Sequence, residues 1–466
     1  METNTLSPID RFNNWIKESV MIKLMSIGFL ILILLIPASW IESLINERQY
    51  RAEDVVREIS NKWSSDQTFT GPVLVIPFTK YEKIKTWQKG IQIEEVSESV
   101  HQAYFLPEQL TIESKVSPQM LHRGIFDAVV YDSKINLKAK FGDLNFEKWN
   151  IPDQQIHWKE AKVVSGMTDL RGISENPVVK SGDKVLVTEP SGDIGLTKQT
   201  DPNVQIPSLK GIASTMNWSS RADIVSTLSM DLQLKGSERL YFVPAGKTTD
   251  VKISGNWPSP SFDGQLLPTS RKVNEKDFTA TWKILSFNRP FAQQWIDDEQ
   301  SLTGSEFGVN LLIPADQYQK SIRTAKYGVL VIILAFTALF LVEITAKIRI
   351  HPFQYILVGA ALIIYYTLLL SFSEHIGYNA AYAVASIATV TLLALYSTTF
   401  LLKKSLSVLF TLLMSVFYTF IFVIIQAEDF SLLIGSVGLF LIIAVIMYFS
   451  RKVRWYKDHN EVSAQS

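Results

Sequence analysis

Strongly apolar residues gather in six blocks, one near the N-terminus and five near the C-terminus. The first lies between Lys23 and Glu42, and the others cover Tyr327–Ala346, Phe353–Phe372, Tyr378–Leu402, Ser405–Gln426 and Phe430–Ser450. A helix needs about 20 apolar residues to cross a hydrocarbon layer of about 30 Å. The pattern therefore predicts an integral membrane protein with six membrane-spanning helices.

The first block has an alternative interpretation as a cleaved signal peptide, because Leu24–Ile36 has the length of a signal-peptide core. However, the stretch Pro37–Trp40 is a poor small-residue cleavage site, and the segment before the core is unusually long for a signal peptide. We therefore expect an uncleaved anchor helix.

Positive charges flank the apolar blocks asymmetrically. The N-terminal tail, alternate short loops and the C-terminal tail carry Arg11, Lys17, Lys23, Lys347, Arg349, Lys403, Lys404, Arg451, Lys452, Arg454 and Lys457. The other two junctions, at Glu374-His375 and Glu428-Asp429, contain no Lys or Arg. Because Lys and Arg accumulate in cytoplasmic loops, both termini are predicted to be cytoplasmic and residues 46–325 to lie outside.

Between the first and second blocks the composition is that of a soluble domain. The segment Glu47–Trp63 has apolar residues at helical spacing, which predicts a helix continuing from the first span. After it come short runs rich in β-branched and aromatic residues and separated by turn residues. These runs are GPVLVIPF, VHQAYFLP, GIFDAVVYDSKINLKAKF, KVLVTEP, STLSMDLQLKG, RLYFVP, VKISGNW and FTATWKILSF.

This texture predicts a large, mainly antiparallel β domain. Ile135, Leu137, Ala139 and Phe141 alternate with polar residues and should share one face of a strand. The expected order is a cytoplasmic tail (1–22), a first helix (23–45), the β domain (46–325), five helices (326–450) and a second tail (451–466). A weak repeat, YFLP at 104–107 and YFVP at 241–244, leaves two related β modules and coincidence both open.

The chain offers little recognisable chemistry. It has no Cys, which excludes disulfides and thiolate nucleophiles. Its 45 basic and 45 acidic residues balance, so no electrostatic footprint for nucleic acid is expected. The six histidines lack close metal-ligand spacing. We therefore predict no catalytic residue, metal site or cofactor, and interpret Asp297-Asp298-Glu299 as a solvated loop. A hydrolase whose triad assembles only on folding stays an alternative.

A transporter typically has ionisable residues near the centres of its helices. The apolar blocks contain none there. Glu343 lies late in its block, and we expect it at the cytoplasmic interface. Hydroxyl-bearing and tyrosine residues such as Tyr365 and Tyr366 are interpreted as helix-packing residues. A transporter that uses the helical bundle remains an alternative.

One polar group of residues is a candidate site. Glu374, His375, Glu428 and Asp429 lie in the two outward-facing junctions. We predict that they form a polar cluster at the outer face of the bundle, which hydrogen-bonds to the base of the β domain. The alternative is that they only mark water-facing turns.

Several stretches are distinctive, namely HPFQY followed by LVG, LLLSFSEH, GPVLVIP, RGIFDAVVY and EDFSLLIGS. In these stretches the chain resembles the CreD family of bacterial inner-membrane proteins, also called cell envelope integrity inner membrane proteins. The resemblance implies the bacterial inner membrane and a role in envelope integrity and stress response. It implies no established enzyme activity, substrate or cofactor. We accordingly expect membrane lipid and an envelope protein, lipid or glycan as partners.

Overall fold

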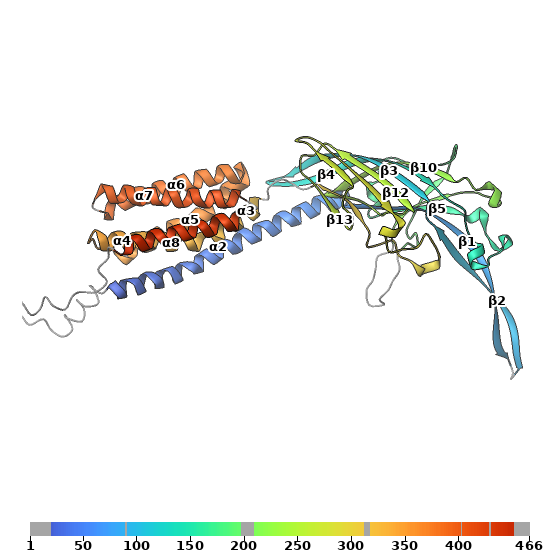
Figure 1. Ribbon diagram of the computed structural model, residues 1–466, viewed down its shortest axis with the longest axis horizontal. Coiled ribbons are helices and arrows are strands. Elements are labelled where there is room, and N and C mark those ends of the chain that lie inside the picture. The colour runs from blue at the N-terminus through green and yellow to red at the C-terminus, as the bar shows by residue number, and fades with distance from the viewer. Residues whose placement is uncertain are drawn as a thin grey trace, which may run out of the picture. The chain divides into compact units, whose positions relative to one another are not determined.

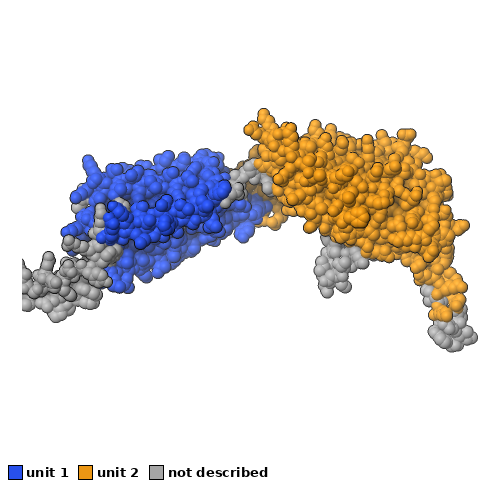
Figure 2. All heavy atoms as spheres, in the orientation of Figure 1, with its two compact units in different colours: residues 1–53, 315–466 blue, residues 54–314 orange. Residues whose placement is uncertain are grey.

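A computed structural model describes residues 20–88, 91–196, 209–311, 317–401, 403–427 and 430–451. The chain forms two compact units (Figure 2). One contains residues 1–53 and 315–466, and the other contains residues 54–314. The sequence placed these boundaries at 46 and 325.

The first unit is a helical bundle, and six helices in the described ranges are long and apolar enough to cross a membrane. This confirms the predicted six helices. They are accompanied by a shorter helix, α3 (Figure 1). The helices are α2 (Val20–Trp63), α3 (Gln317–Lys326), α4 (Gly328–Thr345), α5 (Pro352–Ile376), α6 (Tyr378–Phe400), α7 (Lys404–Gln426) and α8 (Ser431–Ser450).

Helix α2 is longer than a membrane requires. Its 44 residues run without interruption through Pro37 and include the whole segment Glu47–Trp63. At 1.5 Å per residue it measures about 66 Å, roughly twice the thickness of a hydrocarbon layer. The prediction that a helix continues from the first span is therefore confirmed.

Contacts inside the bundle show that successive helices alternate in direction. Lys23 at the start of α2 contacts Glu343 at the end of α4. At the opposite end, Gln426 of α7 donates to Asn379 at the start of α6 over 2.5 Å. Within the bundle, Leu34 of α2 packs so closely against Gly359 of α5 that a side chain at Gly359 would collide with it.

The second unit is a β sandwich. Its first sheet contains β1 (Gln67–Gln88), β2 (Ile91–Phe105), β5 (Lys162–Met167), β8 (Thr188–Ser191), β9 (Gly211–Thr215), β11 (Arg239–Phe242), β13 (Pro260–Gly264), β16 (Gln294–Ile296) and β17 (Phe307–Leu311). Its second sheet contains β3 (Gln109–Arg123), β4 (Phe126–Lys140), β6 (Val178–Ser181), β7 (Lys184–Val185), β10 (Thr227–Ser237), β12 (Thr248–Gly255), β14 (Ser270–Val273) and β15 (Phe278–Leu285).

Short 3₁₀ helices join some of these strands. They are η1 (Glu147–Trp149), η2 (Asp153–Gln155), η3 (Trp158–Glu160), η4 (Leu170–Gly172), η5 (Arg221–Asp223), η6 (Ser286–Asn288) and η7 (Asp297–Glu299). Most strand pairs are antiparallel, as predicted, although β1 pairs with β11 and β3 with β12 in parallel.

The core lies between the two sheets. Ile135, Leu137 and Ala139 of β4 are buried while the residues between them are exposed, which confirms the predicted alternation. They belong to one hydrophobic cluster that also contains Trp282 and Trp295. Burying this apolar surface is the main force that holds the sandwich together.

The repeated YFLP and YFVP stretches occupy equivalent places in this sandwich. Each ends a strand of the first sheet, β2 or β11, and leads into a strand of the second sheet, β3 or β12. The strands that follow lie side by side in parallel, with Gln109 opposite Thr248. Both stretches therefore cross from one sheet to the other around a shared core.

Candidate functional site

The predicted outer-face cluster is represented in the structure by a contact between α3 and α5. The hydroxyl of Tyr318 in α3 donates to Oε1 of Glu374 over 3.2 Å. A second contact joins Thr324 of α3 to the hydroxyl of Tyr378 in α6 over 2.6 Å. Tyr318 and Thr324 are both buried. Glu374 thus helps to hold α3 against the ends of α5 and α6.

Of the other predicted members of the cluster, His375 does not join this contact. His375 is exposed, and its Nδ1 lies 3.0 Å from the carbonyl oxygen of Ser371 in its own helix. Glu428 and Asp429 lie outside the described residues. The described partner of Glu374 is α3, which the sequence placed in the β domain but which belongs to the helical unit.

Glu343, which the sequence predicted at the cytoplasmic interface, lies at the end of α4 beside the start of α2 and is buried there. Its side chain is only 3% exposed and lies 2.6 Å from Nζ of Lys23. It also accepts from the Tyr355 hydroxyl and the Ile350 N–H, each over 3.1 Å. A buried carboxylate is costly unless it is paired and hydrogen-bonded, and these three partners meet that need. The signal in the sequence was a Lys and a Glu at the matching ends of two antiparallel spans.

The interior of the bundle also contains a group of tyrosines. Tyr365 packs against Tyr418 with ring centres 4.6 Å apart and the rings tilted by 57°, and the Tyr382 hydroxyl donates to the Tyr418 carbonyl oxygen over 2.7 Å. Tyr366 packs edge-on against Tyr365 at 4.9 Å. These rings fill the space between α5, α6 and α7. The arrangement agrees with the interpretation of these tyrosines as packing residues.

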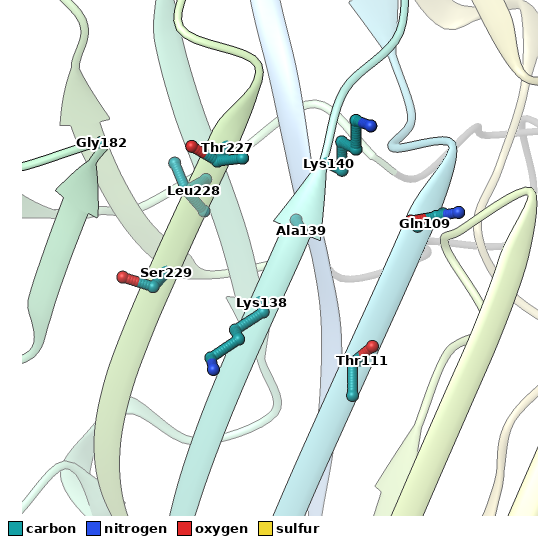
Figure 3. A pocket seen from close by; sticks show the side chains of 9 residues that line it. All are labelled: Gln109, Thr111, Lys138, Ala139, Lys140, Gly182, Thr227, Leu228 and Ser229. Atoms are coloured by element: carbon teal, nitrogen blue, oxygen red, sulfur yellow. The ribbon is translucent and has the colours of Figure 1, made fainter.

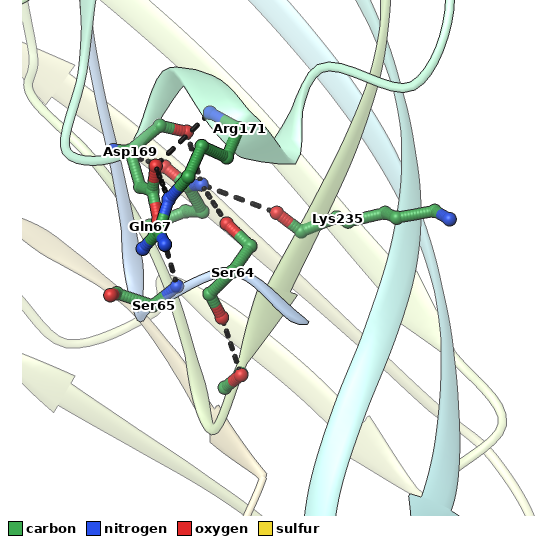
Figure 4. Close-up of polar contacts among 7 residues, drawn as sticks. Ser64, Ser65, Gln67, Asp169, Arg171 and Lys235 are labelled. Atoms are coloured by element: carbon green, nitrogen blue, oxygen red, sulfur yellow. Dashed lines mark hydrogen bonds and ion pairs between the residues drawn. The ribbon is translucent and has the colours of Figure 1, made fainter. Parts of the chain in front are cut away.

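A polar network secures the start of the β domain, where α2 gives way to β1 (Figure 4). The Gln67 side-chain nitrogen donates to Ser64 Oγ and to the Asp169 carbonyl oxygen, each over 2.8 Å. The Asp169 carboxylate accepts from the Ser65 N–H over 3.2 Å and from Arg171 Nη2 over 2.7 Å. Hydrogen bonding to the Arg171 side chain lowers the pKa of Asp169.

Strands β1 and β2 extend beyond the sandwich as a two-stranded ribbon, which we define as residues 80–88 and 91–99 (Figure 1). Their ladder runs from Leu74 opposite Phe105 to Gln88 opposite Ile91. However, β5 pairs with β1 only as far as Val75. Strand β16 pairs with β2 only from Ala103 onward. Among the described residues, no further strand pairs with the ribbon, so both of its edges are open.

A hydroxyl, an imidazole and a carboxylate are lined up at the base of this ribbon. Ser99 Oγ lies 2.8 Å from His101 Nε2, and His101 Nδ1 lies 2.5 Å from Asp297 Oδ2. Asp297 also accepts from the Gln102 N–H over 2.8 Å. Asp297 is 43% exposed, which agrees with the predicted solvated stretch, but its carboxylate is also tied to β2 through His101 and Gln102. Nothing in the local sequence indicated this pairing, because Asp297 and His101 are distant along the chain.

A comparison with known families settles the relationship of the chain. The family model described as inner membrane protein CreD matches residues 19–456. The chain belongs to the CreD inner-membrane protein family. It is also 31% identical over 445 residues to the inner membrane protein CreD of Escherichia coli (strain K12), with 95% of each chain covered. These matches confirm the resemblance found in the sequence, and with it the inner membrane as the location.

Proposed function

We propose that this protein is a non-enzymatic component of the cell envelope that holds an envelope protein against the open β1–β2 ribbon. The β domain lies in the periplasm in this proposal, and binding supports envelope integrity under stress. The observation that carries the proposal is the ribbon itself, whose edges have no partner strand in the described part of the chain.

An open strand edge can bind an extended segment of another protein by adding it as a further strand. Soluble proteins usually cover or shorten such edges because they invite pairing. Here one face of the ribbon carries three exposed apolar side chains among charged ones, because Tyr81, Val96 and Val100 lie on the same side of the two strands and are 54%, 60% and 62% exposed. Main-chain bonds would supply affinity, and these side chains would supply selectivity.

The ribbon is also charged in a way that favours one register of a bound segment. Lys80, Lys83 and Lys85 lie on β1, and Glu94, Glu95 and Glu98 lie on β2. Glu82 on β1 pairs with Lys80, and Lys83 lies 3.8 Å from Glu94 across the ribbon. An added strand would therefore meet a net positive charge at the β1 edge and a net negative charge at the β2 edge. Charge complementarity of this kind contributes to specificity and to the rate of association.

In-cell photo-crosslinking tests the proposal. A photoreactive amino acid at Val96 should capture a defined envelope protein, whereas one at Leu267 should not, although Leu267 is 71% exposed and serves as a matched surface control. Ser97→Pro, which removes one main-chain N–H from the ribbon, should reduce capture at normal protein abundance. Capture of lipid alone, or equal capture from both positions, would contradict the proposal.

The proposed location of the β domain rests on the distribution of Lys and Arg and on the alternating helices of the bundle. Fusions to a reporter active only in the periplasm provide the test. A fusion at residue 200 should be active and one at residue 466 should be inactive. The opposite result at either position would overturn this orientation.

A second candidate function, an envelope hydrolase, is favoured by the line of Ser99, His101 and Asp297. In such chemistry Ser99 Oγ would attack an acyl carbon while its proton passes to His101 Nε2, and Asp297 would orient the imidazole. His101 would then give that proton to the leaving group as its bond to the acyl carbon breaks, and water would release the acyl group from Ser99. The two distances, 2.8 and 2.5 Å, fit these roles. The reaction also needs N–H donors for the oxyanion.

Labelling of the full chain with a fluorophosphonate separates the two functions. We expect no labelling, because the non-enzymatic proposal assigns His101 and Asp297 to anchoring the base of the ribbon. Labelling that disappears in Ser99→Ala and in His101→Ala would replace the binding proposal with the hydrolase. Thr79, which lies 2.8 Å from His157 but is only 4% exposed, provides a Thr79→Ala control.

A further inference from the structure

The outward face of the second sheet carries a group of lysines among uncharged polar residues. Strand β4 presents Lys138 and Lys140 to solvent, two residues apart on the same face. Lys140 lies between Gln109 of β3 and Thr227 of β10, and Lys138 lies between Thr111 and Ser229 of the same two strands. Each ammonium group therefore has uncharged hydrogen-bonding side chains on both sides.

A third lysine extends this arrangement across β10. Lys180 of β6 is exposed and pairs with Ser229, so Ser229 has a lysine on each side. Strands are spaced by about 4.8 Å, which places the backbones of Lys138 and Lys180 about 10 Å apart. A group bound over Ser229 would be within reach of both side chains.

These three lysines differ from several others on the β domain. Lys80, Lys83 and Lys247 form ion pairs with Glu82, Glu94 and Glu108, respectively. By contrast, Lys138, Lys140 and Lys180 form no ion pair with any described residue. Three like charges thus gather without a neutralising carboxylate, an arrangement that a bound anion would stabilise.

The surface is hollowed at the same place (Figure 3). A hollow of about 230 Å³ is lined by side chains that include Lys138, Lys140, Thr111 and Ser229. A second hollow of about 330 Å³ continues from it and shares Gln109 and Lys140. The Glu108 carboxylate at its rim is already paired with Lys247. Asp231 and Glu113 flank Asn136, two residues from Lys138 along β4, so the positively charged area ends there.

We infer that this surface binds the phosphate group of a phosphorylated carbohydrate. Lysine ammonium groups bind phosphate as mobile point charges. The hydroxyl and amide groups of Thr111, Ser229, Thr227 and Gln109 can both donate to and accept from sugar hydroxyls. The hollow is large enough for more than a bare phosphate, and its lining combines these polar side chains with Ala139 and Leu228. This ligand site lies on the second sheet, whereas the proposed protein-binding ribbon belongs to the first, so either can fail alone.

Calorimetric titration of the full chain in a non-ionic detergent provides the test. The probes are N-acetylglucosamine 1-phosphate, N-acetylglucosamine and inorganic phosphate. The phosphorylated sugar should bind more tightly than either of the others. The double variant K138Q/K140Q should weaken its binding by about tenfold or more, which corresponds to at least about 1.4 kcal/mol.

The matched control is K252Q/K283Q, which removes the same charge from the same sheet face. Lys252 and Lys283 lie opposite Glu113 and Asp250 in neighbouring strands. This control should change the affinity by less than about twofold, well under the 1.4 kcal/mol of a tenfold change. Equal weakening in both double variants would mean general charge attraction and would overturn the site.

Two further outcomes would also overturn the inference. The first is equal affinity for inorganic phosphate and for the phosphorylated sugar. The second is binding to vesicles containing phosphatidylglycerol that K138Q/K140Q weakens while no phosphorylated sugar binds, which would assign the surface to lipid head groups. Absence of any binding of the phosphorylated sugar at millimolar concentrations would likewise contradict the inference.

Discussion

The helical bundle buries the carboxylate of Glu343 and a group of packed tyrosines between its helices, whereas the core of the β sandwich is a large cluster of aliphatic and aromatic side chains with hydroxyls such as Ser114 and Ser133 buried at its edge. Water drives apolar side chains together inside the sandwich. Lipid tails are as apolar as the helices, so they supply no comparable force between helices. Packing and hydrogen bonds must hold the bundle together instead. Both units therefore bury polar side chains, but in the bundle a partnered group such as Glu343 takes on more of the work of holding the structure together.

The largest expected effect comes from Glu343. Replacing it with Ala leaves Lys23 and the Tyr355 hydroxyl without their acceptor. Breaking a buried ion pair costs about 3–5 kcal/mol, and we expect the lower end because Lys23 is 34% exposed. Thermal unfolding of the purified chain in detergent should show a lower midpoint.

The control variants for Glu343 sharpen this test. Glu343→Gln keeps an oxygen that can accept from the Tyr355 hydroxyl and the Ile350 N–H, so its effect should be smaller. The double variant Lys23→Met with Glu343→Met should be more stable than Glu343→Ala, because no unpaired charge remains. Equal stability of wild type and Glu343→Ala would show that the pair contributes nothing.

The next effect concerns the junction at Asp169 in the β domain. Asp169→Ala removes the acceptor for the Ser65 N–H and for Arg171, which should cost about 1–3 kcal/mol at neutral pH. Because folding lowers the pKa of Asp169, its contribution is present above the unfolded value of about 3.9 and is lost as pH falls further. Scanning calorimetry should show that wild type and variant differ at pH 7 and converge in acid. A difference that grows toward low pH would contradict this assignment.

A smaller effect is expected for the bond between α3 and α5. Tyr318→Phe removes the hydroxyl that donates to Glu374 and should cost about 0.5–1.5 kcal/mol. Hydrogen exchange should become faster in residues 317–326 and remain unchanged in α6. Tyr327→Phe serves as the control, because no bond of its hydroxyl is described. Unchanged exchange in Tyr318→Phe would show that the bond from Tyr318 to Glu374 does not stabilise α3.

The smallest effect is expected at His375. His375→Ala should change stability by less than about 0.5 kcal/mol, as is usual for an exposed side chain away from any network. Among the described residues, its imidazole contacts a carbonyl of its own helix. Abundance and sensitivity to detergents should therefore equal those of wild type, whereas Glu374→Gln should alter the exchange of α3. A defect in His375→Ala as large as that in Glu374→Gln would support the polar cluster predicted from the sequence and contradict this expectation.

Elements with strong periodicity were predictable. The six helices were predicted from long apolar blocks, and β4 was predicted from the alternation of Ile135, Leu137 and Ala139 with polar residues. The candidate site was less predictable. Glu374 and His375 are neighbours in sequence, but their side chains leave the helix in different directions and take different partners. The polar segments between apolar blocks show where polar residues occur along the chain. They do not show which partners those residues contact in the fold.

The sequence alone determined the membrane class, the number of helices, the β texture of the large domain and the family, because each follows from local composition or from a contiguous stretch of residues. Only the tertiary structure brought Lys23 to Glu343, Asp297 to His101, and Lys180 to the same row as Lys138. These contacts depend on strand register and helix packing between segments that lie far apart along the chain. Such register is set by the whole core, and no short motif records it.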